Sequence, residues 1–77
     1  MKLKIIAPDK TLFEGDVRMV KLPGTLGQFT VLEHHAPLVS TLTEGEIIYK
    51  IGEDEQNVDV RGGVAEVRDN QVTVCVN

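Results

Sequence analysis

Tryptophan is absent from this chain of 77 residues, and phenylalanine and tyrosine together supply only three residues. A protein that binds single-stranded nucleic acid needs aromatic side chains on which the bases stack. A protein that holds a phosphate backbone is usually basic, whereas this chain has twelve acidic and eight basic residues and a net charge of −4. We therefore expect no nucleic acid among its partners, and the composition also disfavours an oligonucleotide-binding barrel.

Cysteine is nearly absent as well, because Cys75 is the only one and cannot form an internal disulfide. The apolar run near the start is too short for a secretory leader. No stretch approaches the roughly 20 apolar residues of a transmembrane helix. These features favour a reducing, cytoplasmic setting. Any association with a membrane would be indirect, through a partner that is already there.

Signatures of catalysis are missing too, since the chain has no nucleophile elbow, P-loop or dinucleotide fingerprint. His34 and His35 are neighbours, and neighbours in a strand point to opposite faces. With only Glu33 close by, they do not make a convincing metal site. Cys75 could pair with either histidine as a nucleophile, but it lies among valines, where cysteine is usually an inert small hydrophobe. We expect no catalytic residue, no metal and no cofactor, and hence no enzyme.

Short strand patterns fill the chain, and no window shows the 3.6-residue period of a helix. At this length we expect one domain, residues 1–77. The predicted strands are Lys2–Ala7, Thr11–Glu14, Val17–Leu22, Gln28–Leu32, Leu38–Leu42, Ile47–Ile51, Gln56–Arg61, Val64–Arg68 and Gln71–Val76. Strands this short, with turns every eight to twelve residues, are typical of an all-β sandwich or barrel.

Turn-forming residues are densest between Leu22 and Ser40. Pro23-Gly24 predicts a β-turn, with proline at the second position and glycine at the third. Leu26 and Phe29 follow in or beside a glycine-bearing loop, where they could form an exposed contact patch. For Phe29, folding back into the core is an equally good interpretation.

Three further local predictions come from charges and small residues. Arg18 and Lys21 interrupt both faces of Val17–Leu22, which suggests that this strand lies near a sheet edge. Asp69-Asn70 tolerates positive φ and predicts a tight hairpin. Gly62-Gly63 predicts a turn or bulge where backbone segments approach closely.

The order and spacing of several motifs are more specific than any one of them. The motifs are Leu3-x-Ile5-x-x-Pro8, Leu12-Phe13-x-Gly15, Val20-x-Leu22-Pro23-Gly24, Gly27, His35-Ala36-Pro37-Leu38, Ser40-x-Leu42-x-x-Gly45, Gly62-Gly63-Val64-x-Glu66-Val67, Asn70 and Val72-Thr73-Val74. Together they resemble the amino-terminal domain of the epsilon subunit of bacterial F-type ATP synthase, the delta subunit of the mitochondrial enzyme. The resemblance covers essentially the whole chain. The carboxy-terminal helical hairpin of that family has no counterpart in these 77 residues.

The resemblance implies an all-β fold, a two-sheet antiparallel β-sandwich of about ten short strands. It also implies a non-catalytic rotor subunit of the central stalk of a proton-translocating ATP synthase. Such a subunit binds the gamma subunit and the membrane c-ring and couples ring rotation to ATP synthesis in the catalytic head. The expected location is peripheral, on the cytoplasmic face of the bacterial inner membrane.

The resemblance also assigns residues to the two partners. The gamma-facing residues would be His35, Ala36, Pro37, Leu38 and Ser40. The c-ring-facing loop would be Thr25, Leu26, Gly27, Gln28 and Phe29. Many family members carry an acid where this chain has Gln28, so a charge-based contact there would be replaced by a weaker hydrogen bond.

A different class of protein gives the alternative interpretation, a small acidic β carrier domain of the biotinyl or lipoyl type. Such domains carry a lysine at an exposed hairpin tip, and this lysine is the residue that becomes modified. Lys21 and Lys50 are the lysines to consider, and both fall within or at the end of predicted strands. The sequence therefore favours the rotor subunit over the carrier domain.

Overall fold

The computed structural model describes all residues, 1–77, and contains nine β-strands and no helix. The strands are β1 (Lys2–Ala7), β2 (Lys10–Asp16), β3 (Met19–Gly24), β4 (Gly27–Leu32), β5 (Leu38–Leu42), β6 (Gly45–Ile51), β7 (Asp54–Val60), β8 (Gly63–Arg68) and β9 (Gln71–Val76). The all-β prediction is confirmed, and the nine strands predicted from residue patterns occur in the predicted order. Helical segments of the length and apolarity needed to span a membrane are absent.

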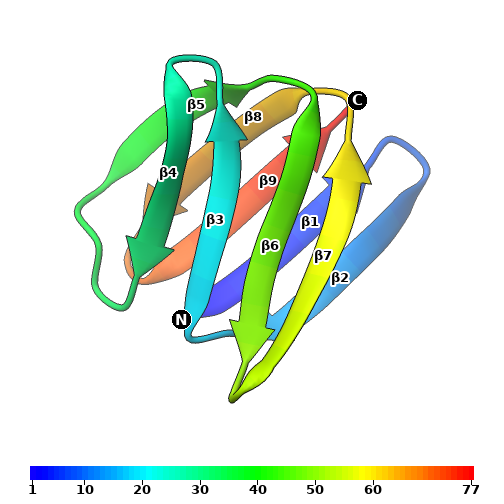
Figure 1. Cartoon of the computed structure of the whole chain (residues 1–77). Coiled ribbons are helices and arrows are strands. Elements are labelled where there is room, and N and C mark those ends of the chain that lie inside the picture. Colours follow the sequence, from blue (N-terminus) through cyan, green and yellow to red (C-terminus); the bar gives the residue numbers. More distant parts are fainter.

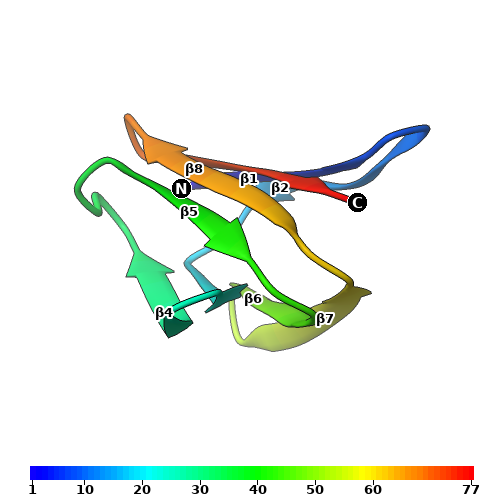
Figure 2. The ribbon, with the colours of Figure 1, turned by 90° about the horizontal axis from the view of Figure 1, so that it is seen from above.

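The strands form two layers that face each other across the core (Figures 1 and 2). The front layer in Figure 1 has the order β4-β3-β6-β7, and the back layer has the order β5-β8-β9-β1-β2. A single pairing between Gly24 of β3 and Leu42 of β5 joins them at one corner. The β-sandwich is thus built from one continuous sheet that curls back on itself.

One pair of strands departs from the antiparallel arrangement that the resemblance implied. β1 and β9 run parallel, with Leu3 beside Val72 and Ile5 beside Val74. Parallel pairing is possible here because nearly the whole chain separates the two strands, so no hairpin dictates their direction. The total of nine strands is also one fewer than the approximate ten.

The core is filled by side chains that alternate along the strands. Val72, Val74 and Val76 of β9 are all buried, whereas Cys75 between them is exposed. The large side chains with almost no exposed surface are Leu3, Ile5, Val20, Leu22, Val31, Ile47, Val67, Val72 and Val74. Each contributes about 1.5–3 kcal/mol of transfer free energy, which conformational entropy largely offsets.

The predicted edge position of the strand around Val17–Leu22 is wrong. β3 lies inside the front layer, paired with β4 along its whole length and with β6 through Met19, Val20 and Lys21. Lys21 is half-buried while its neighbours Val20 and Leu22 are fully buried. A charge on the outer face of a central strand needs only access to solvent, and it therefore does not mark a sheet edge.

Two turn predictions are confirmed by the backbone. Asp69 and Asn70 both have left-handed φ angles, 53° and 59°, between β8 and β9. Gly63 has a φ of 150°, and a Cβ there would overlap the backbone carbonyl oxygen of Cys75 on the neighbouring strand. Glycine at this position lets β8 and β9 meet at the end of their ladder.

Candidate functional site

The predicted turn at Pro23-Gly24 is displaced by two residues. Both residues belong to β3, and the turn itself is formed by Thr25 and Leu26. The carbonyl oxygen of Pro23 accepts a hydrogen bond from the Thr43 N–H, on the side of β3 that pairs with β6. The pairing of β3 with β6 ends before Pro23, so proline is tolerated at this position of the strand. The missing N–H of Pro23 therefore leaves no ladder bond unmade.

The tip of this turn presents an apolar side chain to solvent. Leu26 is fully exposed, and Thr25, Gly27 and Gln28 beside it are exposed too. The backbone N–H of Thr25 donates to the Thr41 carbonyl at 3.0 Å, and the two threonine hydroxyls lie 2.7 Å apart. The turn is therefore anchored to β5 while its tip remains free for a partner.

Phe29 lies apart from this exposed group. It belongs to β4, is half-buried and packs against the core. Its ring also covers Gly24, where an added Cβ would come within 2.9 Å of the ring. Of the two interpretations that the sequence allowed, the structure supports the one in which Phe29 folds inward.

The connection from β4 to β5 carries most of the residues assigned to gamma. Ala36 and Pro37 are exposed, and His35 is partly exposed. The His35 backbone N–H donates to the Leu32 carbonyl at 3.2 Å, and its ring Nδ1 lies 2.7 Å from the Ala36 carbonyl. These bonds hold the connection in a defined shape. His34 and His35 therefore lie in a turn and not in a strand, so the expectation that their side chains point to opposite faces does not apply.

Leu38 and Ser40 continue this segment into β5, and both are half-buried. Leu38 packs against the core, so its side chain stabilises the sandwich more than it offers surface to a partner. The Ser40 hydroxyl donates to the Thr41 carbonyl at 3.0 Å. Between these two residues, Val39 points outward and is 70% exposed, although the sequence analysis did not single it out.

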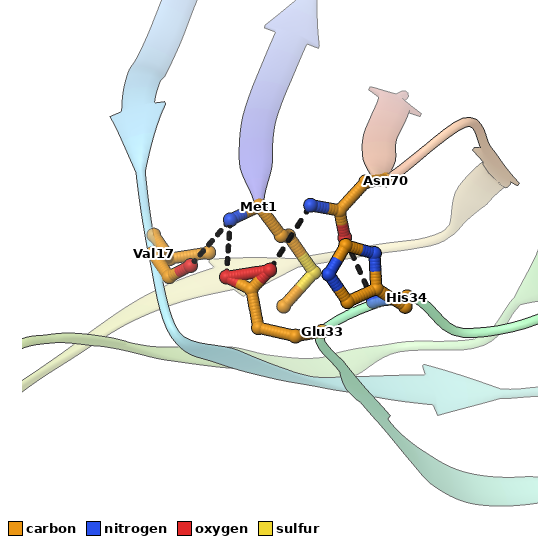
Figure 3. Close-up of polar contacts among 5 residues, drawn as sticks. All are labelled: Met1, Val17, Glu33, His34 and Asn70. Atoms are coloured by element: carbon orange, nitrogen blue, oxygen red, sulfur yellow. Dashed lines mark hydrogen bonds and ion pairs between the residues drawn. The ribbon is translucent and has the colours of Figure 1, made fainter.

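A network of polar contacts links the β4–β5 connection to neighbouring parts of the chain (Figure 3). The Met1 ammonium group donates to the Glu33 carboxylate and to the Val17 carbonyl. Asn70 donates from Nδ2 to the other Glu33 oxygen at 3.0 Å and accepts at Oδ1 from the His34 backbone N–H at 2.8 Å. We call these five residues the Glu33 network. It joins the start of β1, the β4–β5 connection and the β8–β9 turn.

The network has two physical consequences. It accommodates His34 at a φ of 61°, a conformation that is uncommon for a residue other than glycine. Hydrogen bonds from the Met1 ammonium group, and then from Asn70, lower the pKa of Glu33 below its ordinary value. Sequence reasoning missed this arrangement because Met1 and Asn70 each lie more than thirty positions from Glu33 and share no motif with it.

The chemistry that could support a metal ion or a nucleophile is not assembled. No three His, Cys, Asp or Glu side chains lie close enough to hold a metal ion. Cys75 is exposed on the outer face of β9, with Val64 and Ile6 as its neighbours across the sheet. The valines of its strand, Val72, Val74 and Val76, face the core, and Cys75 lies on the opposite face as the strand alternation predicts.

Comparison with known proteins identifies a family whose sequences match this chain. Residues 1–77 match the model of the family described as ATP synthase, Delta/Epsilon chain, beta-sandwich domain. The ATP synthase epsilon chain of Synechocystis sp. is 42% identical over 77 residues, and that of Leptospira borgpetersenii is 40% identical over 77 residues. The chain spans 57% and 61% of the lengths of these two relatives.

A shorter relative and two solved structures agree with this match. The ATP synthase epsilon chain of Caulobacter vibrioides is 39% identical over 74 residues, which are 96% of this chain and 86% of the relative. A chain of the Euglena gracilis mitochondrial ATP synthase superposes with a TM-score of 0.90 at 22% identity, over 96% of this chain and 48% of that one. A chain of the Tetrahymena thermophila mitochondrial ATP synthase central stalk/c-ring superposes with a TM-score of 0.82 at 13% identity, over 97% and 61%. The two structures show the same fold, and the family match over the whole chain shows that this protein belongs to the ATP synthase delta/epsilon family, whose β-sandwich domain it contains.

Proposed function

We propose that this chain is a non-catalytic subunit of the central stalk of a proton-translocating F-type ATP synthase. It binds the gamma subunit and the c-ring and couples rotation of the ring to ATP synthesis in the catalytic head. The complex would hold it on the cytoplasmic face of the bacterial inner membrane, without a membrane contact of its own. The relatives named above, all ATP synthase epsilon chains, support this proposal.

One observation carries the proposal furthest. The two segments assigned to different partners lie at opposite ends of strand β4, with the Thr25–Leu26 turn at one end and the Glu33–Pro37 connection at the other (Figure 1). Six strand residues separate them, a distance of about 20 Å. A body with two separate contact surfaces is what a coupling subunit requires.

The sandwich is suited to transmit force between these surfaces. β4 pairs with β3 along its full length, from Gly27 to Leu32. Its two ends are fixed in addition by the Thr25–Thr41 contacts and by the Glu33 network. The region between ring and gamma would therefore move as one piece, because displacing either end breaks the hydrogen bonds that tie it to other parts of the chain.

The chemistry of the turn suggests how it meets the c-ring. Leu26 supplies an exposed apolar side chain, and Gln28 supplies an uncharged amide. The contact would depend on burial of Leu26 with hydrogen bonding at Gln28, and its strength would vary little with salt concentration. Phe29 contributes indirectly, by holding the start of β4 against the core.

The carrier-domain alternative gains no support from the structure. Lys21 lies within β3 and Lys50 within β6, and both are half-buried. Neither is presented at a hairpin tip, where a modifying ligase could reach it. The family match also belongs to a different class of protein.

The proposal is tested by capture with separate gamma-subunit and c-ring baits. Ala36→Glu places a charge on the exposed β4–β5 connection, and Leu26→Glu does so at the exposed turn. We expect Ala36→Glu to weaken capture by gamma about tenfold or more and to leave capture by the c-ring unchanged, and Leu26→Glu to do the reverse. A charge at Leu38 would be a poorer test, because that side chain packs against the core. The interface assignment fails if both variants bind both baits as the parent does.

A further inference from the structure

The edge strands of the two layers differ sharply in charge. β2 and β5 are the edges of the back layer, and β4 and β7 are the edges of the front layer. β2 and β7 carry three charged residues each, whereas β4 and β5 carry none. Because charges on an edge strand oppose pairing with another chain, the β4/β5 side of the sandwich is the side that lacks this protection.

The backbone of β5 has free hydrogen-bonding groups on that side. The Thr41 carbonyl accepts from the Thr25 N–H, so the main-chain groups of Thr41 face away from β8. Alternate residues of a strand direct their N–H and C=O groups to the same edge, and Val39 therefore directs its groups there too. No strand pairs with β5 on this side except at Leu42. The main-chain groups of Ser40, by contrast, face β8.

The outer face of the back layer beside this edge carries two exposed valines together with Thr41 and with Glu66, which lies opposite Val39. Val39 is 70% exposed, and Val64 on the adjacent strand β8 is 44% exposed. Across the ladder, Val64 lies opposite Thr41. A strand added beside β5 would place every second side chain on this face, next to Val39, where an apolar residue would form a favourable cross-strand contact.

The position of β5 in the chain decides which partner this edge suits. β5 follows directly from His35, Ala36 and Pro37, which the proposed function assigns to gamma. A partner seated on the exposed connection would meet the free edge of β5 next. β4 is also an uncharged edge, but it begins at the turn assigned to the c-ring and ends where the connection assigned to gamma begins.

We propose that an extended, alternately apolar segment of the gamma subunit adds as a strand to the free edge of β5 beside Leu38–Ser40. This inference rests on the proposed function, because it specifies how the same partner is held. Main-chain hydrogen bonds at Val39 would fix the partner's register, and burial of the Val39 side chain would add affinity. The back layer would then gain a sixth strand, contributed by gamma.

Amide hydrogen exchange, followed by NMR on the isotopically labelled chain, tests the proposal directly. Without gamma, the Val39 amide should exchange fast, while the Ser40 amide is protected by β8. With gamma bound, the Val39 amide should slow by about tenfold or more, and the Ser40 amide should change little. A Val39 amide that exchanges equally fast in the complex overturns strand addition.

Two substitutions at Val39 separate backbone pairing from side-chain contact. Val39→Pro removes the N–H on the free edge and leaves the ladder to β8 intact, as proline does on edge strands. Val39→Thr keeps both the N–H and the branched shape. We expect the affinity for gamma to fall about tenfold or more for Val39→Pro and about threefold or less for Val39→Thr. Equal losses, or no loss for a folded Val39→Pro, overturn the proposal. If Val39→Pro fails to fold, exchange in the parent chain decides.

Failure of the inference is distinguishable from failure of the proposed function. If the parent chain does not bind gamma at all, the proposed function is wrong. If it binds gamma and Ala36→Glu weakens binding, but the Val39 amide stays unprotected, only strand addition is wrong. Sedimentation without gamma provides one more check, because a stable dimer with protected Val39 amides would show that a second copy of this chain occupies the edge instead.

Discussion

The ammonium group of Met1 and the carboxylate of Glu33 form an ion pair across 2.5 Å, between residues 32 positions apart in the chain. The pair joins the start of β1 to the connection that leads from β4 into β5 (Figure 3). Through Asn70, the same carboxylate is tied to the turn between β8 and β9. The residues assigned to gamma therefore sit on a support drawn from three distant parts of the sequence.

Replacement of Glu33 by Gln should loosen this support. The amide cannot offer two anionic acceptor oxygens to the Met1 ammonium group and Asn70, so we expect a lower melting temperature. We also expect NMR shift changes confined mainly to His34, His35 and Ala36. Glu53→Gln is the matched control, because Glu53 meets Arg18 at 3.6 Å with both side chains largely exposed. Equal effects of the two substitutions would contradict a structural role for Glu33.

The stability of the protein should fall in acid partly because of Glu33. Its pKa is lowered in the folded chain from an ordinary value of 4.5, so the unfolded chain binds more protons in this range. Stability therefore rises with pH there, is fully gained above about 4.5, and is lost as the pH falls through the folded pKa. Urea unfolding between pH 3 and 7 should show a shallower acid loss for Glu33→Gln than for the parent. Identical profiles would indicate that the pKa of Glu33 is the same in both states.

Gly63→Ala should be among the most destabilising single changes. A Cβ there would overlap the Cys75 carbonyl, and the φ of 150° adds backbone strain. We expect a loss of at least about 3 kcal/mol in the free energy of unfolding. Gly52→Ala is the control, since Gly52 has a φ of 60° but open space around it, and should lose only about 1–2 kcal/mol. A smaller loss at Gly63 than at Gly52 would contradict the close approach of β8 and β9.

Two leucines near the same turn should behave in opposite ways. Leu22 is fully buried, and Leu22→Ala should lower the free energy of unfolding by about 2–5 kcal/mol. Leu26 is fully exposed, and Leu26→Ala should change it by less than about 0.5 kcal/mol. Urea titrations of both variants provide the comparison. A large loss for Leu26→Ala would mean that its side chain packs within the sandwich and is not available to a partner.

The fold was accessible from the sequence wherever the pattern was local. The alternation of Val72, Val74 and Val76 predicted which face of β9 is buried, and the φ tolerance of Asp69 and Asn70 predicted the hairpin. Both features depend only on neighbouring residues, for which side-chain period and backbone sterics suffice.

The errors arose where tertiary pairing decides the outcome. Pro23 predicted a turn because the sequence does not reveal that the Thr43 N–H donates to its carbonyl. Lys21 suggested a sheet edge because the sequence does not reveal that β3 is paired with β4 on one side and with β6 on the other. No local sequence pattern predicts the contacts of Glu33, because its partners Met1 and Asn70 lie far from it in the sequence.

The central claim is that the two ends of β4 meet two different partners, and photo-crosslinking in the assembled ATP synthase tests it most directly. A photoreactive amino acid would replace Leu26 in one variant and Ala36 in another, with exposed Asn57 on β7 as the control position. We predict crosslinks from position 26 to the c subunit, from position 36 to gamma, and to neither from position 57. Crosslinks from positions 26 and 36 to the same subunit, or to neither subunit, would contradict the claim.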